Sequence, residues 1–268
     1  MKKSFTVLIF VFILSLSVLT ACGVLQDPET PSAPIEAIPL ETLSTGVDAT
    51  TIPATEVPAT EAPGTEVTPT VIAPIDEPAE EVEPAAEAVA GTRVYTIDQS
   101  ESQVRFELDE DLRGERLTVI GLTDQVAGQL SLDLADLSQT QVGIIQINAR
   151  TLLTDNNFRN RAIQNEILST GQWEFITFVP TAIDGLPASV AIGEPVTFTI
   201  SGDLTIRNIT LPAAFTIQAT AVSDDQLVGS AVTVINREDF GLRIPSVPNV
   251  ANVEEEVELY IDFTANAS

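Results

Sequence analysis

The stretch that decides the fold lies near the C-terminus and reads Val257-Glu258-Leu259-Tyr260-Ile261-Asp262-Phe263. Apolar side chains alternate with polar or amphipathic ones, which is the period of a β-strand that buries one face. The same period of two recurs in five further segments, 103–108, 129–134, 145–149, 196–200 and 215–219. Antiparallel strands with one buried and one solvated face have this pattern. The pattern therefore predicts an antiparallel sheet with half-buried strands.

One segment departs from this alternation and predicts a short helix. We expect Asp155 to cap a helix that runs through Phe158 and Ile167 and ends at Gly171. About eight strands and one helical excursion within residues 93–268 predict a single all-β domain, either a closed barrel or a sandwich. A barrel has the advantage that it leaves no exposed strand edge.

The N-terminus has the features of a secretory signal peptide over residues 1–21. Lys2 and Lys3 precede an apolar run from Phe5 to Val18. The next residues, Leu19-Thr20-Ala21-Cys22, resemble the lipobox of bacterial lipoproteins, in which the cysteine is acylated and becomes the first residue after cleavage. Cys22 is the only cysteine of the chain. We therefore expect lipid attachment at Cys22 and an extracytoplasmic location, anchored to a bacterial cell membrane. An uncleaved span over residues 4–21 is the alternative.

Residues 22–92 are expected to form the acylated cysteine and a disordered linker. Residues 23–92 contain 11 of the 17 prolines and 14 acidic residues, with no aromatic residue and no Lys or Arg. Such a composition cannot bury enough apolar surface to fold. A flexible coil of this length would span about 45 Å. The sequence thus predicts a charged spacer between the anchor and a domain at residues 93–268.

The charge and the residue types exclude several classes of function. The chain of 268 residues has 12 Lys and Arg against 39 Asp and Glu, a net charge of −27, and no histidine. Its only lysines are Lys2 and Lys3, so the folded part offers no Schiff-base lysine, imidazole base or histidine-ligated metal. The negative charge opposes nucleic-acid binding. We expect no catalytic residue, no metal and no cofactor.

A set of ordered motifs carries a family resemblance. These motifs are Tyr95-Thr96-Ile97-Asp98, Ser102-Gln103-Val104-Arg105-Phe106, Thr151 and Thr154 before Arg159, Phe175-Ile176-Thr177-Phe178, Gly202-Asp203-Leu204-Thr205-Ile206 and the segment 235–241. In order and spacing they resemble the YceI family over nearly all of residues 93–265. The resemblance implies a lipocalin-like eight-stranded barrel whose apolar interior holds a polyisoprenoid chain, which means binding and not catalysis. Where the family often has histidine, this chain has Glu101, Ala162 and Arg207, so a metal or headgroup role of those histidines is not carried over.

The alternation also predicts which side chains point inward. The inward set comprises Phe106, Leu132, Ile145, Ile147, Phe178, Phe198, Ile200, Phe215, Ile217, Leu259, Ile261 and Phe263. These side chains suit a plain packed core as well as a cavity. The family resemblance favours the cavity, which would bind an apolar chain by removing its surface from water.

Three hypotheses of function follow. The first is a cell-envelope lipoprotein that binds a polyisoprenoid or a similar long lipid for sequestration or carriage. In that case Arg159 and Arg161 are candidates for contact with a polar headgroup at the barrel mouth, although pairing with nearby acids is the commoner role of such residues. The first alternative is a surface interaction or adhesion module with a packed core. The second is a carboxylate-based hydrolase, since residues 93–268 contain 25 acids.

Overall fold

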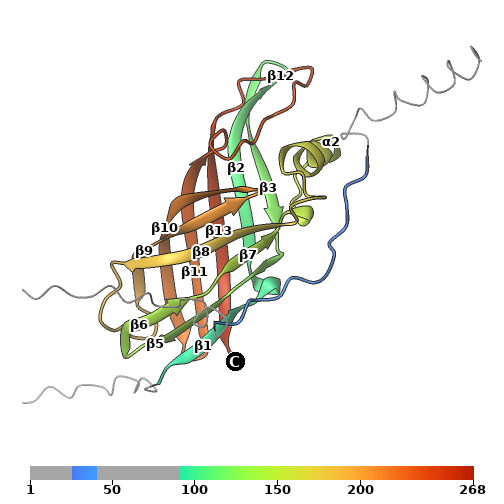
Figure 1. Cartoon of the computed structure of the whole chain (residues 1–268). Helices are drawn as coiled ribbons and strands as arrows, with labels where there is room; N and C mark the ends of the chain where they lie inside the picture. Colours follow the sequence, from blue (N-terminus) through green and yellow to red (C-terminus); the bar gives the residue numbers. More distant parts are fainter. Residues whose placement is uncertain (1–25, 41–90) are drawn as a thin grey trace, which may run out of the picture.

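The computed structural model describes residues 26–40 and 91–268 (Figure 1). The predicted signal peptide, the lipid-attachment residue Cys22 and most of the predicted linker lie outside the described residues.

The described residues form one antiparallel sheet with short helical turns. Its strands are β1 (Arg93–Ile97), β2 (Gln103–Leu112), β3 (Glu115–Thr123), β4 (Val126–Ala127), β5 (Gln129–Asp133), β6 (Asp136–Val142), β7 (Ile145–Asn148), β8 (Phe175–Asp184), β9 (Pro195–Ile206), β10 (Ile209–Ser223), β11 (Gln226–Asn236), β12 (Val250–Ala251) and β13 (Glu256–Ala267). The helical turns are η3 (Gln99–Glu101), η4 (Ala149–Thr151), α2 (Asn157–Arg161) and the π-helix η5 (Ala162–Ile167). None of the helices in the described ranges is long and apolar enough to cross a membrane.

Several of these strands are parts of longer strands that short breaks divide. Only η3 and its flanking residues separate β1 from β2, and Gly128 alone separates β4 from β5. Counted across such short breaks, β1–β2, β3–β4–β5, β6–β7, β8, β9, β10, β11 and β13 make eight long strands. The predicted all-β, antiparallel, lipocalin-like fold with one short helix is therefore confirmed.

The sheet curls strongly into a half-barrel (Figure 1). Strand β13 pairs with β11 on one edge and with β2 and β1 on the other. The hairpin of β4–β5 with β6–β7 joins β8 to β1, because β7 pairs with β8 and β5 pairs with β1. This hairpin closes the end of the sheet that holds β1. At the other end β3 pairs along its length only with β2, and a single bridge joins Leu122 to Leu153.

The helix begins one residue later than expected. The side chain of Asn156 accepts hydrogen bonds from the backbone N–H groups of Phe158 and Arg159 and caps α2. The prediction that Asp155 is the cap is wrong. Both residue types are good caps, so the sequence alone does not choose between them. The carboxylate of Asp155 instead pairs with Arg159 one turn further on, at 2.6 Å.

Residues 26–40, which we call the strap, lie on the outside of the domain (the blue segment in Figure 1). The sequence predicted disorder here. Instead Ile35 is only 4% exposed, and its carbonyl accepts a hydrogen bond from the side chain of Gln99. Asp27 pairs with Arg161 at 2.7 Å, and Glu29 pairs with Arg150 at 2.8 Å. The domain supplies the cations that this acidic segment lacks, which the local composition could not reveal.

Glu174 is the central contact between strap and domain. One of its carboxylate oxygens accepts hydrogen bonds from the backbone N–H of Ser32 at 2.8 Å and from the side chain of Asn148 at 2.9 Å. The other lies 3.1 Å from the Arg150 guanidinium. Burial disfavours the ionised carboxylate, but the hydrogen bonds from Ser32 and Asn148 and the charge of Arg150 outweigh it and lower the pKa of Glu174 from its ordinary value of 4.5.

We expect the strap to loosen in acid. A carboxyl whose pKa is lower in the folded state stabilises that state above its unfolded pKa, and this contribution is lost as the pH falls through the folded pKa. The contribution of Glu174 is therefore complete at neutral pH and decreases below 4.5. Hydrogen exchange at the Ser32 amide, corrected for the intrinsic rate, measures the effect. Glu174→Gln should remove the pH dependence, and protection that persists in acid in the unsubstituted protein would contradict the assignment.

Candidate functional site

The inward faces of the strands enclose two cavities. The larger has a volume of about 450 Å³ and lies between β2, β13 and the helix α2–η5, under the loop of residues 242–250. The smaller has a volume of about 130 Å³ and lies deeper in the barrel, toward β1 and β5. The alternation that predicted the strands also makes these cavities apolar, because every second side chain of each strand points inward.

The charged groups of this interior all line the larger cavity. The walls of the smaller cavity are apolar except for Thr140 and Thr220. The larger cavity includes the charged residues Arg105, Glu110, Arg113, Arg159 and Arg237 and the polar residues Asn156, Asn249 and Tyr260. The interior is thus apolar at its inner end and carries charged groups at its outer end.

Two aromatic rings stand between the cavities. Phe178 of β8 and Phe215 of β10 line both cavities, and so does Ile261 of β13. The ring centroids of the two phenylalanines lie 4.9 Å apart with an interplanar angle of 66°. This edge-to-face contact is a favoured aromatic geometry. The pair divides the interior into an outer and an inner chamber.

Glycines opposite the aromatic side chains make room for their rings. Phe106 pairs with Gly121, and Phe263 pairs with Gly229 across neighbouring strands. A Cβ atom at Gly121 would lie 2.1 Å from the Phe106 ring, and one at Gly229 would lie 2.7 Å from the Phe263 ring. At Gly202 a Cβ atom would lie 2.4 Å from the backbone oxygen of Val179 and 2.7 Å from the Phe178 ring. The glycines therefore let the rings lie flat against the wall.

The structure places all twelve side chains of the predicted inward set in the walls of these cavities. Phe106, Ile147 and Leu259 line the larger cavity, and Phe178, Phe215 and Ile261 line both. The smaller cavity takes the rest, Leu132, Ile145, Phe198, Ile200, Ile217 and Phe263. Their contact with a ligand stays a prediction.

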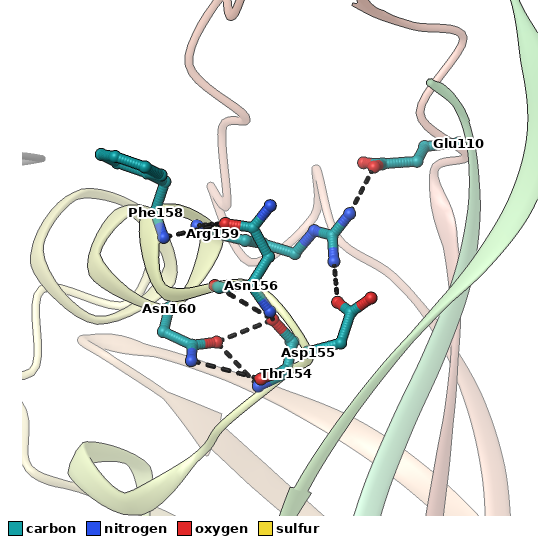
Figure 2. Close-up of polar contacts among 7 residues, drawn as sticks. All are labelled: Glu110, Thr154, Asp155, Asn156, Phe158, Arg159 and Asn160. Atoms are coloured by element: carbon teal, nitrogen blue, oxygen red, sulfur yellow. Dashed lines mark hydrogen bonds and ion pairs between the residues drawn. The ribbon is translucent and has the colours of Figure 1, made fainter. Parts of the chain in front are cut away.

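The two arginines predicted at the mouth have different positions. Arg159 lines the larger cavity, where its guanidinium pairs with Glu110 of β2 at 2.7 Å and with Asp155 (Figure 2). Arg161 is absent from the cavity walls and pairs with Asp27 of the strap. Arg161 thus belongs to the same helix but does not face the cavity, because residues two apart on a helix project to nearly opposite sides.

The Glu110–Arg159 pair joins the helix to the β2–β3 hairpin. Its carboxylate belongs to a residue that is only 6% exposed. The helix itself is fixed by Asn160, whose side-chain oxygen accepts hydrogen bonds from the backbone N–H and the hydroxyl of Thr154, both at 2.7 Å (Figure 2). A buried charge needs such a partner, so the pair holds the helix as a wall of the outer chamber.

The sequence analysis missed the cover of the larger cavity. Leu242, Ile244, Pro245, Val247 and Pro248 line it. This loop has no periodic pattern, so strand periodicity could not find it. Its signal is the density of apolar and proline residues in a segment between two strands.

A family model described as the YceI-like domain matches residues 95–265. The chain belongs to the YceI-like family. This confirms the resemblance seen in the sequence.

Solved structures have a similar fold to this YceI-like chain. One is a polyisoprenoid binding domain from Saccharophagus degradans implicated in plant cell wall breakdown, with a TM-score of 0.52 and 14% identity over 65% of this chain and 98% of that one. Another is BcnA from Burkholderia cenocepacia, with a TM-score of 0.51 and 18% identity over 63% of this chain and 99% of that one. At these identities the likeness concerns the fold. Among curated protein sequences, none matches the chain.

Arg207, at one of the positions where the family often has histidine, has a local role. Its guanidinium lies 5.1 Å from the centre of the Trp173 ring. It also donates hydrogen bonds to the backbone oxygens of Ile167 and Gly241, at 3.2 and 3.3 Å. Arg207 thus ties the end of the helix to the β9–β10 turn and to the start of the cavity cover.

We expect Gly202→Ala to destabilise the domain more than Gly121→Ala. At Gly202 the new methyl group meets backbone that cannot move without disturbing the sheet. Overpacking of this kind costs about 1–3 kcal/mol. At Gly121 the three atoms nearest to the new methyl group all belong to the Phe106 ring, which has the larger cavity beside it. Denaturant unfolding of the two variants measures the difference, and equal losses would show that the Phe106 ring is as fixed as the backbone.

Proposed function

We propose that this protein binds a polyisoprenoid or a similar long apolar lipid in the two chambers and sequesters or carries it. The protein does no chemistry on the ligand. We further propose that acylated Cys22 anchors it on the extracytoplasmic side of a bacterial cell membrane. The observation that carries the proposal is the apolar interior, whose inner chamber is lined by aliphatic and aromatic side chains and whose charged groups line only the outer chamber.

The chemistry of the chambers supports an apolar chain as the ligand. A hydrocarbon chain inside them would lose contact with water, at a gain of about 25 cal/mol per Å² of its surface. The inner chamber offers almost no hydrogen-bonding group to a polar ligand, whose burial there would be costly. The similar structure from Saccharophagus degradans is described as a polyisoprenoid binding domain, which supports the same ligand class.

The environment of the acidic side chain in the cavity walls supports binding over hydrolysis. Of the described residues that line the two cavities, Glu110 is the only Asp or Glu. It is held by Arg159 at 2.7 Å, and no second carboxylate faces it across the cavity. Glycoside hydrolysis usually uses two carboxylates on either side of the scissile bond.

Ile217→Trp tests the ligand chamber. Ile217 is 5% exposed and lines the smaller cavity. We expect the indole to fill this cavity, so that the ligand-free protein loses less than the cost of about 1–3 kcal/mol that overpacking of a filled core would bring. The amount of lipid recovered by organic extraction and mass spectrometry should fall sharply.

Ile217→Leu is the matched control, since it keeps the side-chain volume and should keep the ligand. If the unsubstituted protein yields no apolar molecule, binds no added polyprenyl chain, and loses stability with Ile217→Trp, the interior is a packed core. The interaction-module hypothesis would then replace lipid binding.

Cys22→Ser tests the anchor independently. Without the thiol no acyl chain can be attached, and the protein should leave the membrane fraction or accumulate as an unprocessed precursor. Metabolic labelling with a radioactive fatty acid measures attachment directly. Label that persists in the substituted protein would show that Cys22 is not the site.

A further inference from the structure

The strap ties the region next to Cys22 to the helix. The backbone oxygen of Gln26 accepts a hydrogen bond from the side chain of Asn165 in η5 at 2.9 Å. Asp27 pairs with Arg161 of α2. Cys22 precedes Gln26 by four residues, and a chain spans at most about 3.6 Å per residue. The Cα atom of Cys22 is therefore within about 15 Å of that of Gln26.

Residues 41–90 add nothing to this distance. The backbone N–H of Leu40, before this segment, donates to the side chain of Gln129 at 3.4 Å. The backbone N–H of Gly91, after it, donates to the side chain of Asp133 at 3.1 Å. Both partners belong to β5. The described residues on either side of this segment thus contact the same strand, and of the predicted linker over residues 22–92 only residues 23–25 stand between Cys22 and the strap.

The same helix forms the mouth of the larger cavity. Phe158 of α2 lines the cavity and is 65% exposed, and Val247 of the cavity cover lines it and is 43% exposed. Because both side chains reach the solvent, the cavity opens between the helix and the cover. The mouth and the Cys22 end of the strap are therefore at the same end of the molecule.

The mouth also carries two arginines that form no ion pair with a described residue. Among the ten arginines of the described residues, eight have an ion pair or a side-chain hydrogen bond. The other two are Arg113, which lines the larger cavity, and Arg243, which is exposed between the lining residues Leu242 and Ile244. Acidic residues also lie at this end, among them Glu115 and Asp239, so the two arginines are distinguished by having no ion pair and not by a local excess of positive charge.

The opposite end of the barrel also exposes apolar side chains, Ile192 at 39% and Val222 at 49%, but its arginine Arg93 pairs with Asp225. The β8–β9 connection lies beside the end of β10, since the backbone N–H of Gly193 donates to the oxygen of Ala221 at 2.8 Å. Asp184, Glu194 and the turn residues Asp224 and Asp225 lie at this end. Among the described residues both ends thus expose apolar side chains, and the mouth end alone adds arginines without an ion pair, a combination that favours an anionic lipid surface.

We propose that the strap holds the mouth of the larger cavity against the bilayer that carries acylated Cys22. In this arrangement Phe158, Val247, Arg113 and Arg243, which we call the mouth rim, contact the anionic phospholipid surface, and an apolar ligand passes between bilayer and cavity without crossing water. The inference rests on the proposed function, in which Cys22 is acylated and the ligand is a membrane lipid.

Introduced cysteines can report the orientation, because acylated Cys22 has no free thiol. Val247→Cys places a nitrobenzoxadiazole dye on the mouth rim, and Ala191→Cys places it at the opposite end. The full-length acylated protein is reconstituted into vesicles of phosphatidylcholine and phosphatidylglycerol that contain headgroup spin-labelled lipid. We expect strong quenching at position 247 and little at position 191. Similar quenching at the two positions would overturn the orientation.

The role of the strap is tested with Asp27→Asn/Glu29→Gln/Ile35→Ala, which leaves every residue of the barrel unchanged. Quenching at position 247 should fall toward the level at position 191. The control is Glu36→Gln/Asp203→Asn, which removes the same charge from exposed side chains that have no ion pair, and it should quench as the unsubstituted protein does. Full quenching in the strap variant, with an unchanged unfolding temperature of the barrel, would show that the strap does not orient the mouth.

The contribution of the mouth rim is tested with Arg113→Gln/Arg243→Gln. The variant should lose the dependence of quenching on phosphatidylglycerol, and a dependence that remains would show that these arginines do not contact the lipid. Failure of the proposed function gives a different result. If the unsubstituted chain takes up the thiol dye, Cys22 is not acylated, and if it yields no lipid on extraction, the ligand assignment fails, whichever way the barrel is oriented.

Discussion

Strand β13 is the element on which the two sides of the sheet depend. On one edge it pairs with β11 through eleven residue pairs. On the other edge it pairs first with β2 and then with β1. Strand β1 pairs with β5, and the hairpin of β4–β5 with β6–β7 leads on to β8. Strand β13 therefore joins this hairpin to the meander of β8–β11. Without its inward residues Leu259, Ile261 and Phe263, neither chamber would have a wall on this side.

The sequence predicted this architecture because the strands obey a strict local rule. Leu259, Ile261 and Phe263 can only lie on the same face of a strand, whatever surrounds them. The same reasoning placed Phe198 and Ile217 on the cavity walls correctly. It was weaker where two residues satisfied the same rule, as Asp155 and Asn156 did at the helix cap.

The features that sequence reasoning missed depend on contacts between distant segments. The strap is acidic and rich in proline, and nothing within it indicates that Arg150 and Arg161 lie opposite its acids. Arg161 seemed free for a headgroup for the same reason. The cavity cover between Leu242 and Val250 could not be predicted either. Nothing in this segment itself shows that its apolar side chains lie over the barrel interior.

If a chain ligand occupies the two chambers as proposed, the contact between Phe178 and Phe215 makes its affinity a stepped function of chain length. A chain that ends in the outer chamber gains burial with each added carbon until it meets the rings. A longer chain reaches the inner chamber only after it displaces an aromatic contact of about 0.5–1.5 kcal/mol. Beyond that threshold each methylene again contributes about 0.8 kcal/mol. A ligand one or two carbons past the rings would therefore gain little, whereas one that filled both chambers would gain much more, so under the proposed function this aromatic pair would set a minimum useful length for the ligand.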